Sequence, residues 1–161
     1  MAPLPTPPIP PPPTDDPLLD RALEAGASAW RRGNLAAAQQ LLNLSLSRAE
    51  ARGDSAGALR ARQILGHVAF DSGDLEGAQR HHRAVLEQSQ ALGLVIGEAS
   101  ALHNLGLVAA ARGDQVAARR MITAAVARYE AIGHGSGARS ARTNLALLGE
   151  HWAGQLGDSG E

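Results

Sequence analysis

Glycine recurs along this chain at one fixed interval. Gly26, Gly66 and Gly106 lie 40 residues apart. Three more series keep the same step: Gly33, Gly73 and Gly113; Gly53, Gly93 and Gly133; Gly57, Gly97 and Gly137. Four series in one phase indicate a repeated structural unit. Chains built from stacked units of this size usually bind other molecules along an extended surface.

Within a repeat, the pattern predicts two helices joined by a tight turn. Ile64, Leu65 and Val68 recur at the spacing of one helix face, Gly73 ends that helix, and Asp74 caps the next one. No proline follows Pro17, as expected for a helical body. The predicted helices are 18–32, 35–52, 55–72, 75–92, 95–112, 115–132 and 136–153.

The ends of the chain differ from this body. Residues 1–17 hold all nine prolines and are predicted to be a disordered tail that samples polyproline II. Three roles stay open for this tail: a flexible spacer, a ligand for a polyproline-binding domain, or a segment that folds back onto its own protein. Residues 18–153 form the predicted repeat domain, and the glycine-rich residues 154–161 a second disordered tail.

Composition excludes several kinds of chemistry. The chain has no cysteine and no lysine, so thiolate catalysis and lysine Schiff bases are excluded. A net charge of −1 does not favour a nucleic-acid partner, and no apolar run is long enough to span a membrane. We expect a cytoplasmic protein that is not an enzyme, with no catalytic residues, no cofactor and no metal.

The small residues at fixed positions resemble those of the tetratricopeptide repeat family. Glycine stands in the first helix (Gly26, Gly66, Gly106) and in the turn, and alanine stands early in the second helix (Ala38, Ala78, Ala118). The 40-residue unit is similar to a longer-unit subgroup seen in kinesin light chains, cell-polarity adaptors and sensor domains of bacterial regulators. The resemblance implies an all-α, right-handed α-solenoid of three helix-turn-helix units plus a C-terminal capping helix.

The resemblance also implies that the first helices of successive units line a concave peptide-binding groove. The residues carried over to it are Trp30, Arg60, Gln63, His67, Phe70, His103, Asn104, Thr143 and Asn144. Asn104 and Asn144 are expected to hold the backbone of a bound peptide, since an amide both donates and accepts. The alternative is that they are structural or solvated. Arg60 is expected to meet acidic groups of the ligand.

Aromatic and histidine side chains raise separate alternatives. Trp30 and Phe70 either fill a gap between units or form an apolar anchor pair for a ligand. His67 and Asp71 have the spacing of two metal ligands on a helix but no evident third, so no metal site is predicted. His82 replaces Leu42 and Ile122 at a packing position and is expected to be partly buried and hydrogen-bonded.

The predicted function is therefore non-catalytic. The protein is expected to be an adaptor that binds an extended peptide or a helix of a partner protein in its groove. The alternative is a structural protein that associates with copies of itself.

Overall fold

The repeat pattern folds into helices throughout the described part of the chain. The computed structural model describes the backbone of residues 15–157 and the side chains of residues 15–149; within these limits it contains seven helices and no strand. They are α1 (Pro17–Arg31), α2 (Leu35–Ala51), α3 (Ser55–Asp71), α4 (Leu75–Ala91), α5 (Val95–Ala111), α6 (Gln115–Ala131) and α7 (Gly135–Gly157).

The predicted boundaries of the first six helices are correct to within one residue. The helix α7 instead continues to Gly157, past the predicted end at residue 153. A single glycine in a helix costs only about 1 kcal/mol, so Gly154 does not stop a helix that contains no proline. Residues 1–14 and 158–161, which make up most of the two predicted tails, lie outside the described residues.

Six glycines end helices α1 to α6, as their spacing predicts. Gly33 has φ 76° and Gly53 has φ 68°, and the four equivalent glycines also have positive φ. This left-handed conformation is one that glycine adopts without a steric penalty. The residue after Gly33 then caps the next helix, since Asn34 Oδ1 accepts from the Ala37 N–H at 3.2 Å.

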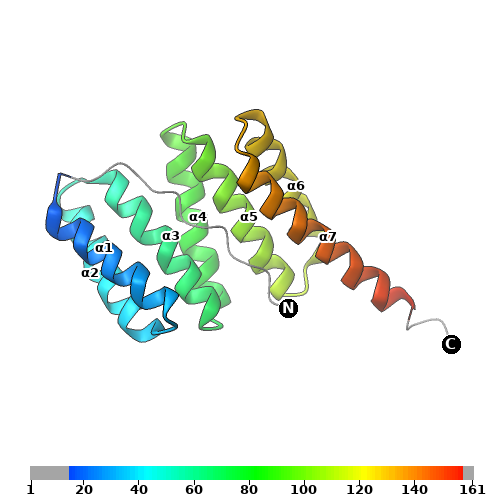
Figure 1. Ribbon diagram of the computed structural model, residues 1–161, viewed down its shortest axis with the longest axis horizontal. Helices are drawn as coiled ribbons and strands as arrows, with labels where there is room; N and C mark the ends of the chain where they lie inside the picture. Colours follow the sequence, from blue (N-terminus) through cyan, green and yellow to red (C-terminus); the bar gives the residue numbers. More distant parts are fainter. Residues whose placement is uncertain (1–14, 158–161) are drawn as a thin grey trace. The chain divides into compact units, whose positions relative to one another are not determined.

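The described chain divides into two compact units, which we call the N-terminal unit (residues 15–88) and the C-terminal unit (residues 89–157). In the N-terminal unit α1 packs against α2, α2 packs against α3, and α3 also contacts α1 (Figure 1). The C-terminal unit repeats this order with α5, α6 and α7. Within the N-terminal unit, α1 and α3 contact one another, and the ion pair between Asp20 and Arg60 joins residues one period apart on the two helices.

Close helix crossings explain the first glycine series. A Cβ atom on Gly26 would lie 2.7 Å from Leu42 Cγ, and one on Gly66 would lie 2.6 Å from His82 Nε2. Both separations are well inside van der Waals contact, so a larger residue would force the paired helices apart. The sequence-based expectation that these glycines mark helix crossings is confirmed.

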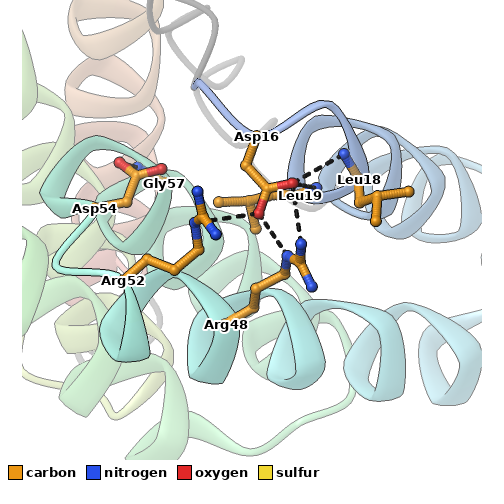
Figure 2. Close-up of polar contacts among 7 residues, drawn as sticks. All are labelled: Asp16, Leu18, Leu19, Arg48, Arg52, Asp54 and Gly57. Carbon is orange, nitrogen blue, oxygen red and sulfur yellow. Dashed lines mark hydrogen bonds and ion pairs between the residues drawn. The ribbon is translucent and has the colours of Figure 1, made fainter.

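The start of α1 is fixed to the end of α2 by Asp16 (Figure 2). Its carboxylate accepts from the Leu18 N–H at 3.1 Å and the Leu19 N–H at 3.3 Å, which makes it the helix cap. It also accepts from Arg48 Nε at 2.5 Å, and Arg52 Nε lies 3.4 Å away. The Arg48 hydrogen bond lowers the pKa of Asp16 to about 2. These contacts hold the first turn of α1 against the last turn of α2.

Candidate binding face on α1 and α3

The 40-residue period places matching positions of α1 and α3 next to one another. One group of side chains comes from the adjacent faces of these two helices, and we call it the α1–α3 face. Its members are Asp20, Glu24, Trp30 and Arg31 from α1, and Arg60, His67 and Asp71 from α3. Asp20 is the equivalent of Arg60, and Arg31 is the equivalent of Asp71, so the charges at these matched positions are opposite.

Ion pairs neutralise the first half of the α1–α3 face. Arg60 Nη1 lies 3.8 Å from Asp20 Oδ1, and Arg60 Nη2 lies 3.7 Å from Glu24 Oε2. Arg31 Nη2 also reaches Glu24 Oε1, at 2.8 Å. The exposed pair of Arg31 and Glu24 contributes about 0–1 kcal/mol. Arg60, which was expected to meet acidic groups of a ligand, therefore already faces two carboxylates of its own unit.

Trp30 is held in place by two contacts at the other end of the face. Its Nε1–H donates to Asp71 Oδ2 at 2.6 Å. Its ring stacks on His67, with ring centroids 5.0 Å apart and an interplanar angle of 13°. The side chain packs against the core of the N-terminal unit yet stays only half-buried. Trp30 thus fills space between α1 and α3, and part of its surface stays exposed to solvent.

His67 connects this surface to the interior of the unit. Its ring meets the edge of His82, with centroids 5.3 Å apart at 65°. His82 is 1% exposed, so its predicted burial is confirmed and is more complete than expected. The predicted hydrogen bond is not found at Nδ1, which is buried and has no partner among the described residues. Burial, and then the neighbouring His67 and His81, lower the pKa of His82 well below its ordinary value.

The two remaining predicted residues of the N-terminal unit differ in exposure. Gln63 is buried, at 2% exposed, whereas Phe70 is half-buried. His67 is itself buried. Among residues 15–149, no three His, Cys, Asp or Glu side chains are arranged to hold a metal ion.

In the C-terminal unit, three of the four predicted groove residues lie below the surface. His103, Asn104 and Asn144 are buried, and Thr143 is exposed. Asn144 Nδ2 lies 2.7 Å from His103 Nε2 in a buried hydrogen bond. Burial lowers the pKa of His103 to about 4, so its ring is neutral at pH 7 and Nε2 serves as the acceptor. At least one of the two asparagines is thus occupied within the protein.

The contacts that sequence reasoning missed follow a simple rule. Trp30 and Asp71 are 41 residues apart, and so are His103 and Asn144. In each unit, a side chain on one helix (α1 or α5) therefore contacts a side chain 41 residues later, on the second helix after it (α3 or α7). A search for complementary donors and acceptors at that separation would have found both pairs.

The matches to known sequences agree with this architecture. A tetratricopeptide repeat profile matches residues 61–131, from the middle of α3 to the end of α6. No curated protein matches the chain. With the helical content of the described residues, the profile match confirms the predicted all-α repeat fold class. No described helix combines the length and the apolar character needed to cross a bilayer.

Proposed function

Because this chain is a tetratricopeptide repeat protein, we propose that it is a non-catalytic adaptor that binds an extended peptide or a helix of a partner protein on the α1–α3 face. Repeats of this family generally mediate protein–protein interactions. The observation that carries the proposal is Trp30, a half-buried ring held by Asp71 and His67 on a face of otherwise paired charges.

A fixed aromatic side chain is well suited to bind a partner. Tryptophan is enriched among the residues that dominate binding energy at protein interfaces. Ordering a mobile side chain on binding costs about 0.5–1.5 kcal/mol, and Trp30 is ordered before any partner arrives. The ion pairs of Arg60 and Arg31 would form the polar rim that usually surrounds such an anchor.

The same proposal gives the buried residues of the C-terminal unit a supporting role. His103, Asn104 and Asn144 lie below the surface and would hold the first helices of that unit in register. Thr143 is exposed and is the residue of this set that a ligand could reach without rearrangement. Its hydroxyl bonds to the Arg139 carbonyl at 3.0 Å and keeps a free acceptor position.

Selection from a random peptide library tests this function. Trp152 is first replaced by phenylalanine (W152F), so that Trp30 is the one remaining tryptophan. Selected peptides should change Trp30 fluorescence saturably, and Trp30→Ala should weaken their binding about tenfold or more.

The matched control is Leu44→Ala, which removes an apolar side chain that is 69% exposed on α2 and should leave affinity unchanged. Equal binding by wild-type protein and by a folded Trp30→Ala variant would contradict the proposal.

Self-association is the second candidate function. It is favoured by Leu147, an apolar side chain of the last helix α7 that is 40% exposed. Sedimentation equilibrium separates the two: a mass that rises with concentration, and falls back in Leu147→Gln, would favour self-assembly. A constant monomer mass would exclude it.

A further inference from the structure

We propose that the partner of the α1–α3 face presents an arginine side chain to Trp30 and Asp71. This inference rests on the proposed peptide-binding function and specifies the ligand chemistry that the face selects. It follows from three features: the unpaired charge of Asp71, the fixed plane of the Trp30 ring, and the geometry of a guanidinium group.

Asp71 is the carboxylate of this face that has no cationic partner. Asp20 and Glu24 both face Arg60, and Glu24 also pairs with Arg31. Asp71 is exposed, and among the described residues it bonds only to the indole N–H of Trp30. That bond uses one lone pair of Oδ2, so the remaining lone pairs of the carboxylate stay available. With three carboxylates and two guanidinium groups, the face has an excess negative charge located beside the tryptophan.

The Trp30 ring supplies the second half of a cation site. Tryptophan is the best aromatic partner for a cation, which lies over the ring face within about 6 Å of its centroid. One face of Trp30 is stacked on His67, and the indole N–H points to Asp71, so the carboxylate lies at the ring edge. Donation to an anion also polarises the indole and increases the negative charge of its π face.

Arginine fits this arrangement better than lysine. A guanidinium is planar and can stack on the indole while its N–H groups point in the plane toward the carboxylate. An ammonium group is compact and strongly hydrated, so it satisfies one contact well but not both. An acidic side chain would meet the unpaired Asp71 and be repelled.

Fluorescence titration of the W152F protein tests the inference. The probes are four capped pentapeptides that carry arginine, citrulline, lysine or glutamate at the centre of an alanine sequence. Citrulline matches arginine in shape but has no charge. The arginine peptide should change Trp30 fluorescence saturably and bind about tenfold more tightly than the citrulline peptide. The lysine peptide should fall between them.

Two variants locate the effect. Asp71→Asn keeps an oxygen that accepts from the indole N–H but removes the charge, so it should abolish the preference for arginine. Glu76→Gln removes one charge from an exposed carboxylate of α4 in the same unit, and it should retain the preference.

Equal affinity for the arginine and citrulline peptides, no saturable response to any of the four, or an arginine preference that survives in Asp71→Asn would each overturn the inference. Library peptides that bind through Trp30 without an arginine would overturn it while leaving the proposed function intact. Failure of the library to yield any binder would instead count against the function. A rise in the mass of the protein on its own, lost in Asp71→Asn, would assign the arginine to a second copy of this chain and likewise overturn the proposal of a separate partner.

Discussion

His82 stands where the equivalent positions of the other repeats hold Leu42 and Ile122. It is fully buried against Gly66, and its Nδ1 atom has no partner among the described residues. A buried polar atom without a hydrogen bond costs about 1–3 kcal/mol. The residue is therefore a local weakness in a packing position that an aliphatic side chain fills elsewhere.

Replacing His82 with leucine should stabilise the protein by about 1–3 kcal/mol at pH 7. The folded-state pKa of His82 lies well below its ordinary value, 6.5, so protonation favours the unfolded chain. The contribution of His82 is constant above pH 6.5 and falls as the pH drops below it. Thermal unfolding from pH 7.5 to 5 should show a shallower loss of stability for His82→Leu than for wild type. An identical slope would contradict this reading.

Gly66→Ala should destabilise the protein by about 1–3 kcal/mol, because the added Cβ atom would overlap the buried His82 ring. Gly135→Ala is the matched control: apart from adjacent residues and the nearby backbone of its own helix, no atom lies within 4 Å of the position of its Cβ. That variant should be neutral or slightly stabilising. Chemical denaturation measures the free energy of unfolding of both variants. Equal values would show that the helix crossing at Gly66 can accommodate a Cβ atom.

At the scale of the helices, side-chain caps and ion pairs recur from repeat to repeat, with local exceptions. Asp54 caps α3 by accepting from the Gly57 N–H at 2.8 Å, but its equivalent Leu94 gives α5 no side-chain cap. Ion pairs across the longer turns repeat too, since Glu50 pairs with Arg62 and Glu130 with Arg142 at the same separation. The exceptions identify positions at which a helix could be improved.

Leu94→Asp should stabilise the C-terminal unit by about 1 kcal/mol by supplying the missing cap to the Gly97 N–H. Leu94 is 44% exposed, so part of its apolar surface already contacts solvent. Asp54→Ala should cost a similar amount in the N-terminal unit. Denaturant midpoints report both changes. A lower midpoint for Leu94→Asp would mean that the leucine packs more tightly than its exposure indicates.

The junction of α1 and α2 should be sensitive to acid. The folded-state pKa of Asp16 is about 2, below its ordinary value of 3.8, so the stabilisation it gives is present above pH 4. It is lost as the pH falls through about 2. Asp16→Asn can still cap the helix but lacks the charge. The difference in melting temperature between wild type and Asp16→Asn should be constant at neutral pH and shrink between pH 4 and 2; a difference independent of pH would exclude the ion pair as its cause.

For the whole chain, the sequence was a better guide to the fold than to the site. The period, the turn glycines and the absence of proline after Pro17 determined six helices to within one residue. The order of helices in each unit followed from the same pattern. These features are local and repeat, so each repeat supports the interpretation of the next.

The site depends on contacts between repeats, and these were harder to predict. Groove positions carried over by equivalence included Gln63 and Asn144, which are buried. A residue's position in the repeat predicts where it lies along its helix. It does not predict which side chain of the neighbouring helix covers that residue. The bond between Trp30 and Asp71 depends on the offset between helices, which periodicity alone does not fix.

Nuclear magnetic resonance of the protein with a library-selected peptide tests the central claim most directly. The indole N–H of Trp30, which donates to Asp71, gives a resolved signal in the W152F protein. We predict that the peptide shifts that signal, together with backbone amides on α1 and α3. Unchanged indole and α1 signals, with shifts confined to α2 or α6, would contradict it.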